Sequence, residues 1–273
     1  MSELLKSSLN ILIPALALTI GLLFGSFYTA LADRILYFYY GKGRKSNRKW
    51  EKIFFKPSFC FNCNREIEKF FLIPILGFIL TGGKCRHCKS RIGIIRLLGE
   101  LYPGILLLSL ILLGEKWAFS FFTLLFIGNL YISIATDWNF FLLDYENSAF
   151  LYLWGFSAIF SEYGFGKTMQ YHIYTALFVF IILLILFIIG RGEKFGMGDL
   201  ILAPSLAFYL GPLKSIFLFQ SAASLSILFI LFIQKNRKAP SPFGAFMAIS
   251  FFLIQFADVV LRFYNIAVLS YFR

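Results

Sequence analysis

Charged residues are scarce in this chain of 273 residues: they make up 15% of it, and the acidic kind is the scarcer, with 14 Asp and Glu against 26 Lys and Arg. Cysteine occurs only four times, which together with the length excludes a small secreted fold built on disulfides. The low charge and the 59% hydrophobic content exclude a disordered chain, and the composition excludes a collagen-like one. No glycine-rich dinucleotide fingerprint is present, so no nucleotide site of that kind is indicated.

Apolar residues, and phenylalanine above all, are what the sequence has in abundance. It contains 36 Phe, aromatic residues make up 20% of it, and the mean hydropathy is +0.77. One soluble core of this size cannot bury so many, whereas several apolar runs approach the roughly 20 residues that cross a bilayer as a helix. The sequence therefore predicts an all-α polytopic membrane protein of about eight transmembrane helices, near residues 9–32, 97–113, 117–136, 140–160, 172–190, 199–212, 214–233 and 243–262.

A shorter apolar run, residues 70–80, contains Pro74 and Gly77 and is expected to form part of a loop or an interfacial segment rather than a span. The predicted division of the chain is a first transmembrane helix over 1–32, a basic loop over 33–96 and a multi-helix membrane domain over 97–273.

Basic residues are distributed unevenly between the two sides that these spans define. Fifteen lie in residues 33–96, two in 191–198 and three in 234–242, while the remaining six lie on the opposite side. The positive-inside rule therefore places the 33–96 loop in the cytoplasm and both termini outside. A cleaved signal ending at Ala30-Leu31-Ala32 is the alternative, but the apolar stretch exceeds the roughly 7–15 residues of a signal core and a basic segment follows it.

The four cysteines form two CxxC pairs in the predicted cytoplasmic loop. Cys60 and Cys63 make the first pair, and Cys85 and Cys88 the second. Two such knuckles supply the four thiolates of a tetrahedral Zn²⁺ site, and a reducing compartment argues against disulfides. With four ligands the site would be closed and structural, and His87 would be a solvated loop residue. Four free or redox-active thiols are the alternative.

Acidic residues near the spans call for a structural or functional explanation, because inserting a carboxylate at the centre of a transmembrane helix costs about 2.5–3.5 kcal/mol. Asp137 ends the third span and Asp199 opens the sixth, and the topology places both at the cytoplasmic ends of their helices. Two carboxylates that meet there share one proton and form an acid and a base able to activate water against a peptide carbonyl. Asp199 follows Gly196 and Gly198, which permit close backbone approach. The alternative is a capped helix start at Asp199 and a solvated helix end at Asp137.

Two other acids have structural interpretations. We expect Asp258 to make a helix–helix hydrogen bond and Asp33 to pair with Arg34 at the interface.

These motifs together resemble those of the bacterial type IV prepilin peptidases, membrane aspartic proteases of the GxGD type. Besides the two CxxC pairs, the matching elements are Gly25-Ser26-Phe27 with Arg34, Ile73-Pro74, Gly82-Gly83-Lys84-Cys85, Glu100, Glu193-Lys194-Phe195-Gly196-Met197-Gly198-Asp199, Leu206-Ala207, Leu210-Gly211 and Pro242-Phe243-Gly244. The chain departs from the family at Leu142-Leu143-Asp144, where a Leu-Pro-Asp is usual.

The resemblance implies that Asp137 and Asp199 are the catalytic pair of a leader peptidase, within an active-site loop that includes Glu193, Gly196 and Gly198. It implies that the 97–273 domain is the peptidase, in the bacterial cytoplasmic (inner) membrane, acting on type IV prepilins or pseudopilins of pilus or secretion systems. It also implies methylation of the new N-terminus with S-adenosylmethionine, an activity associated in the family with Gly83-Lys84.

Two other functions are weighed against the peptidase. A transporter or proton relay would also explain intramembrane acids, but both key acids lie at one face, and it gives no role to a Cys₄ site. A nucleic-acid-binding or scaffolding protein would use the basic loop. Membrane topology already explains much of that charge, and Trp50, Phe54 and Phe55 are expected to seat the loop on the bilayer, so the lipid bilayer and not nucleic acid is the predicted partner.

Overall fold

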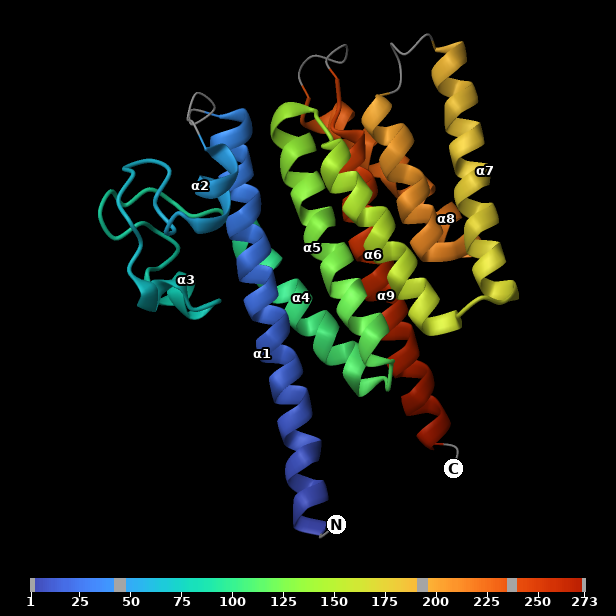
Figure 1. The fold of residues 1–273 in the computed structure, drawn as a ribbon, viewed down its shortest axis with the longest axis horizontal. Helices are drawn as coiled ribbons and strands as arrows, with labels where there is room; N and C mark the ends of the chain where they lie inside the picture. Colours follow the sequence, from blue (N-terminus) through green and yellow to red (C-terminus); the bar gives the residue numbers. More distant parts are fainter. Residues whose placement is uncertain (1–2, 42–47, 191–195, 235–239, 272–273) are drawn as a thin grey trace. The chain divides into compact units, whose positions relative to one another are not determined.

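The computed structural model describes residues 3–41, 48–190, 196–234 and 240–271. In these ranges the chain is helical, with two isolated β-bridges and no longer strands. The long helices are α1 (Glu3–Ile35), α4 (Ile94–Leu112), α5 (Trp117–Phe140), α6 (Tyr145–Tyr163), α7 (Lys167–Ile189), α8 (Met197–Phe232) and α9 (Phe243–Tyr271), and the short elements are η1 (Leu36–Tyr40), α2 (Lys49–Phe55), η2 (Lys69–Leu72) and α3 (Leu76–Leu80) (Figure 1).

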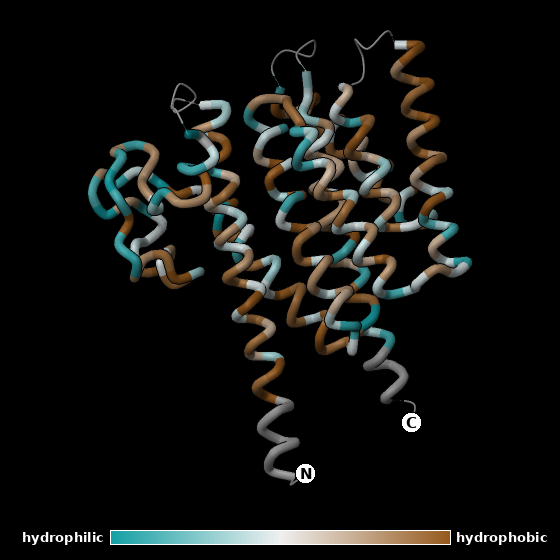
Figure 2. Tube along the Cα trace, viewed as in Figure 1, coloured by the Kyte–Doolittle hydropathy of each residue, from teal (hydrophilic) through white to brown (hydrophobic). Residues whose placement is uncertain are grey.

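The prediction of an all-α polytopic membrane protein is confirmed. Each of the eight predicted apolar stretches overlaps a helix, and within the described residues six helices are long and apolar enough to cross a membrane: α1, α4, α5, α7, α8 and α9. In Figure 2 the coloured parts of these helices are predominantly hydrophobic, whereas residues 56–91, which carry the cysteines, include many hydrophilic residues. The predicted span over 140–160 forms α6, a helix of 19 residues that opens with Glu146 in its first turn.

The chain forms two compact units, Met1–Leu112 and Leu113–Arg273. Unit 1 contains α1, α4 and the cysteine segment, and unit 2 contains α5 to α9. The three-part division at residues 32 and 96 stays a prediction.

In unit 1 the helices α1 and α4 pack at very short range because glycines face each other. A Cβ atom on Gly21 would lie 2.5 Å from the carbonyl oxygen of Pro103, and one on Gly25 would lie 2.7 Å from that of Glu100. Small residues that let helix backbones approach are typical of helix contacts in membranes. Gly25 of the Gly-Ser-Phe motif therefore has a packing role.

The two polar residues at the end of α1 bind different partners. Asp33 forms an ion pair with Arg96 of α4, so the predicted pairing of Asp33 with Arg34 is wrong. Arg34 instead binds α2 and the residues just after it. Its guanidinium donates to the carbonyl of Ile53 at 3.0 Å and to the hydroxyl of Ser58 at 3.2 Å. The end of α1 thereby fixes both α4 and α2.

The core of unit 2 is aromatic. The ring of Tyr209 in α8 packs on Phe126 of α5 and on Phe251 of α9, with ring centroids 4.8 and 5.2 Å apart. The Tyr209 hydroxyl lies 2.7 Å from that of Thr123, so the buried phenol has a partner. Away from these rings, Asp258 of α9 binds Lys214 at 2.8 Å, a contact between α9 and α8.

Helix α8 is two helical segments joined by a break at Gly211, whose φ of 74° suits glycine. Pro212 follows and has no N–H to donate to the carbonyl of Phe208, four residues earlier. The ring Nδ1 of His172 in α7 bonds that carbonyl instead. The predicted boundary between spans at 199–212 and 214–233 is therefore real, and both ends of α8 lie at the same end of unit 2 (Figure 1).

Candidate active site and metal centre

Unit 2 brings the two predicted aspartates together. Asp137 lies near the C-terminal end of α5 and is 6% exposed, and Asp199 lies in the first turn of α8. Both face Gly244 at the start of α9: a Cβ atom built there would lie 3.0 Å from Asp137 Oδ2 and 3.1 Å from Asp199 Oδ1. The two carboxylate oxygens are therefore separated by no more than the sum of these distances, although the residues are far apart in sequence.

The N-terminus of α9 holds one of the two carboxylates. The backbone N–H of Ala245 donates to Asp137 Oδ2 at 2.6 Å. A helix N-terminus carries partial positive charge and unsatisfied N–H groups, so it stabilises a negative charge at that oxygen. This contact favours Asp137 as the ionised member of the pair.

Leu143 covers the pair from the loop between α5 and α6. Its Cδ1 lies 2.9 Å from the Cβ position at Gly244, and its Cβ lies 2.8 Å from the Cβ position at Gly198. Both glycines are thus required by close approach, Gly244 by the carboxylates and Gly198 by Leu143. Gly196 is next to Asp199, whose backbone N–H donates to the Gly196 carbonyl at 3.1 Å. Glu193, the other predicted member of this loop, lies outside the described residues.

The helix after this loop is fixed to α5 close to Asp137. The side-chain amide of Asn147 in α6 donates to the carbonyl of Asn129 at 2.9 Å and to the hydroxyl of Ser133 at 2.8 Å. Asp144 immediately precedes α6, and burial together with the nearby Glu146 raises the pKa of Asp144 to about 6. The pair at Asp137 and Asp199 thus has a third, less buried acid in the adjoining loop.

Two carboxylates at this separation form an acid–base pair. Repulsion between like charges in a partly buried place disfavours two ionised groups, so the pair most readily holds one proton and one negative charge. Such a pair can take a proton from water and give one to a leaving amine.

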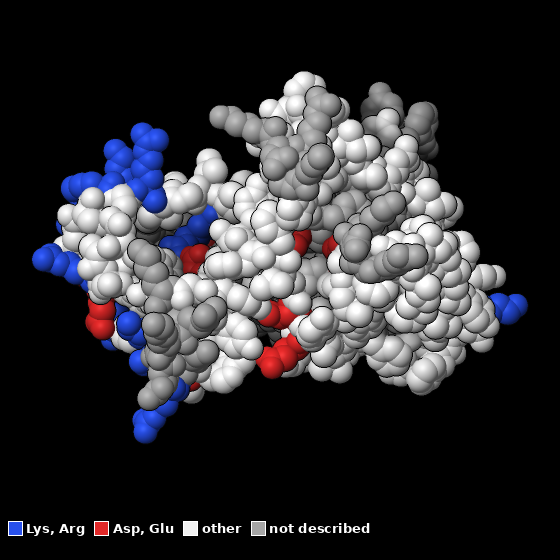
Figure 3. Space-filling model, turned by 90° about the horizontal axis from the view of Figure 1, so that it is seen from above, with Lys and Arg blue, Asp and Glu red and all other residues white. Residues whose placement is uncertain are grey.

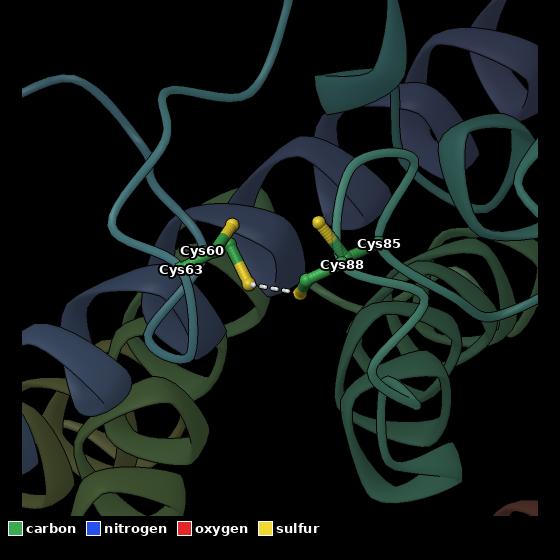
Figure 4. Close-up of side chains that lie close together, drawn as sticks. All are labelled: Cys60, Cys63, Cys85 and Cys88. Atoms are coloured by element: carbon green, nitrogen blue, oxygen red, sulfur yellow. Dashed lines mark hydrogen bonds between the residues drawn. The ribbon is translucent and has the colours of Figure 1, made fainter.

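The four cysteines come together in unit 1 on two knuckles with the same backbone course (Figure 4). In the first, the N–H of Cys60 donates to the carbonyl of Arg65, and the N–H of Asn64 donates to the carbonyl of Cys60. In the second, the N–H of Cys85 donates to the carbonyl of Ser90, and the N–H of Lys89 donates to the carbonyl of Cys85. A residue with φ near +57° follows each pair, Asn64 in one and Lys89 in the other.

The sulfur positions fit a tetrahedral metal ion. The four Sγ atoms lie within 4.8 Å of one another, and those of Cys60 and Cys88 are 3.7 Å apart. Zinc–sulfur bonds of about 2.3 Å in a tetrahedron place sulfurs about 3.8 Å apart. Hydrogen bonds from Ser90 lower the pKa of the Cys88 thiol to about 5, whereas the neighbouring thiols help raise the pKa of Cys63 to about 11, so the support for a metal comes from the sulfur geometry. The ring of His87 lies beside Arg65, with Nδ1 3.2 Å from its guanidinium.

Gly83 and Lys84 lie at the base of the second knuckle. Gly83 has a φ of +65°, and a Cβ there would lie 2.8 Å from the ring of Phe78. Lys84 forms the β-bridge with Arg91 that closes the knuckle. The geometry therefore gives both residues a structural place in the second cysteine knuckle.

Sequence reasoning missed the residues that complete the aspartate site. Pro242-Phe243-Gly244 resembles a family motif, and in the structure it leads into α9, where Gly244 gives the close approach and the next residue, Ala245, gives the N–H donor. Leu143 belongs to the Leu142-Leu143-Asp144 stretch that departs from the family pattern, but an apolar residue in an apolar sequence gave no indication of its contact with the aspartate site.

Comparisons with known proteins point in one direction. Residues 19–113 match the family described as the bacterial peptidase A24 N-terminal domain. A prepilin leader peptidase/N-methyltransferase of Vibrio cholerae is 30% identical over 90 residues, 33% of this chain and 33% of that protein. One of the same description from Pseudomonas aeruginosa is 26% identical over 223 residues, 76% of this chain and 74% of that protein. No solved structure gives a significant match.

Proposed function

We propose that this chain, whose resemblance to the type IV prepilin peptidases is confirmed by these relatives, is a leader peptidase that cleaves type IV prepilins or pseudopilins by aspartic-protease chemistry. The observation that carries the proposal is the convergence of Asp137 and Asp199 on Gly244. Support for the chemistry comes from this chain's geometry, and support for the substrate comes from the names of the relatives.

The two aspartates have different roles in this mechanism. Asp137, bonded by the N–H of Ala245, is the base that takes a proton from the attacking water. Asp199 holds the shared proton and polarises the scissile carbonyl, then gives the proton to the leaving amine. The glycine at 244 lets both carboxylates come close to the start of α9.

The cleavage site faces the cytoplasm of a multi-pass inner-membrane protein in this proposal. The support is the distribution of basic residues, 20 of the 26 of which lie in the segments 33–96, 191–198 and 234–242. Labelling of single introduced cysteines should find Lys45 and Lys238 inside and Lys167 outside.

Zinc is the metal we propose for the cysteine site, held by Cys60, Cys63, Cys85 and Cys88. Four thiolates leave no open coordination position, so the ion would join the two knuckles and take no part in hydrolysis.

Methylation of the new N-terminus with S-adenosylmethionine is the second proposed activity. It rests on the names of both relatives and on the resemblance at Gly83-Lys84. Incubating the chain with cleaved prepilin and S-adenosylmethionine should add one methyl mass to the pilin. Cleavage without that mass would make the protein a peptidase alone.

A transporter or proton relay is less well supported. Buried polar residues do follow one another along α5, but three of them donate to the helix's own carbonyls: Asn129 to that of Leu125, Ser133 to that of Asn129 and Thr136 to that of Ile132. Thr123 instead pairs with the hydroxyl of Tyr209. Polar groups satisfied in this way pack helices together rather than form a relay.

The test is cleavage of a labelled prepilin by variants in proteoliposomes. Asp137→Asn and Asp199→Asn should each abolish cleavage and retain folding, because an amide has similar size but cannot act as base or acid. Asp258→Asn is the matched control, because the Asp258 carboxylate binds Lys214 and Arg262 away from the aspartate pair. This variant should cleave the prepilin normally. Wild-type cleavage by either of the first two variants would refute the assignment.

A further inference from the structure

An uncharged stretch in unit 1 exposes apolar side chains beside the cysteine knuckles. Residues 70–83, which include most of η2 and all of α3, contain no charged side chain. Phe70, Leu76 and Ile79 are 60%, 51% and 63% exposed, and Leu72, Ile73 and Leu80 are exposed as well. An exposed apolar patch of this kind indicates a surface that binds another apolar phase.

The attachment of this stretch places it at membrane depth. The backbone N–H of Ile75 donates to Glu100 Oε2 at 2.8 Å, and the hydroxyl of Ser26 donates to Glu100 Oε1 at 3.2 Å. Ser26 lies well inside the candidate span Ile11–Tyr40. It precedes Arg34, the attachment point of α2, by eight residues, or about 12 Å along a helix. In Figure 1, α3 accordingly lies farther along α1 from its C-terminal end than α2 does.

The backbone of the stretch is suited to a place without water. The N–H groups of Phe71, Leu76, Gly77, Ile79, Thr81 and Gly83 all donate to carbonyls within residues 68–79. The N–H of Ile75, a residue with φ of 65°, is the one that Glu100 accepts. Irregular backbone at bilayer depth requires such internal partners.

Basic and aromatic residues flank the apolar stretch at the level of Arg34. On α2, Trp50 and Phe54 are exposed and stack with ring centroids 6.3 Å apart, and Tyr39 lies 5.8 Å from Trp50. Exposed Arg48 and Lys52 lie on or beside this helix, and Figure 3 shows basic side chains gathered over this part of the chain. Aromatic rings with cations are typical of the headgroup layer of an anionic leaflet.

We infer that the segment η2–α3 is a membrane anchor: it inserts into the acyl chains of the leaflet next to the 33–96 loop, while α2 lies above it among anionic phospholipid headgroups. The partner is a phospholipid bilayer, and the inference does not depend on the peptidase activity. It holds the metal-binding knuckles at a fixed height against the membrane, tied to α4 through Glu100.

Photo-crosslinking in proteoliposomes tests the inference. We would place p-azidophenylalanine at residue 79 in the full chain, reconstitute it in phosphatidylethanolamine and phosphatidylglycerol, irradiate, and measure adduct masses. Phe78 is the matched control, because this neighbouring ring is half-buried and lies 2.8 Å from the Cβ position of Gly83. The metal content of both variants checks that the knuckles fold.

The expected result is that phospholipid adducts form at position 79 and do not form at position 78. Three outcomes would overturn the inference: adducts to another segment of this chain or to a second copy, adducts to a different protein, or products of reaction with water alone at position 79.

Discussion

Gly244→Ala tests the aspartate site without removing any of its chemical groups. The new methyl group would lie 3.0 Å from Asp137 Oδ2, 3.1 Å from Asp199 Oδ1 and 2.9 Å from Leu143 Cδ1. All three distances are shorter than ordinary van der Waals contact, so the carboxylates and Leu143 must each move by a few tenths of an ångström or more. The substitution therefore displaces both carboxylates at once.

The expected effect separates activity from stability. Misplacing reacting groups by about 1 Å costs on the order of 10²-fold in rate, which corresponds to about 2.7 kcal/mol of transition-state stabilisation. Alanine in the first turn of α9 favours helix over glycine by roughly 0.8–1.0 kcal/mol, which offsets part of the strain. We expect kcat/KM for prepilin cleavage to fall by up to about 10²-fold, the figure for a full 1 Å displacement, while the unfolding temperature changes little.

The assay compares cleavage rates and thermal unfolding for Gly244→Ala and Gly166→Ala in the same detergent. Gly166 is the control because a Cβ there meets only the carbonyl of Tyr163, at 3.8 Å, and its backbone is extended. Wild-type cleavage by Gly244→Ala would refute the placement of both carboxylates at this glycine. Loss of cleavage together with loss of folding would show that the glycine is structural.

Two further predictions concern the metal and pH. Cys85→Ser should lower zinc content and loosen the knuckles, because a hydroxyl replaces a thiolate ligand, while His87→Ala should keep zinc; elemental analysis of protein purified without chelator that finds none in the unsubstituted chain would contradict the site. For Asp144, the raised pKa of about 6 means that the folded state holds its proton more tightly than the unfolded one, so stability decreases as pH rises from about 4 through about 6. Asp144→Asn should remove this dependence and gain at most about 1 kcal/mol above that range, since solvent screens a partly exposed group; unfolding temperatures with the same pH slope in both proteins would contradict it.

Helix positions and the pairing of the two aspartates were accessible from the sequence because few physical rules govern them. Long apolar runs must be helical in lipid, and charge asymmetry orders them relative to the membrane. That order alone placed Asp137 and Asp199 at similar depth. The cysteine site was equally accessible, since two CxxC pairs fix both the ligand number and the local turn.

The contacts that could not be predicted from the sequence depend on which faces of the helices pack against each other. Asp33 has two arginines within reach of its end of α1, and only the packing of Gly21 and Gly25 against α4 decides for Arg96 over Arg34. In the same way, the residues Phe243-Gly244 do not predict that an N–H group at the start of α9 donates to the carboxylate of Asp137, more than 100 residues away in sequence.

The break at Gly211 has a consequence for how the protein enters the membrane. The half of α8 before the break has about 14 residues and rises about 21 Å, which is less than the roughly 30 Å of hydrocarbon it would have to cross by itself. The segment from Met197 to Phe232 must therefore be integrated as a hairpin, with its turn leading at Gly211-Pro212 and both arms following together. In the orientation proposed above, both ends of such a hairpin stay at the cytoplasmic side, so Asp199 would never have to be carried across the bilayer.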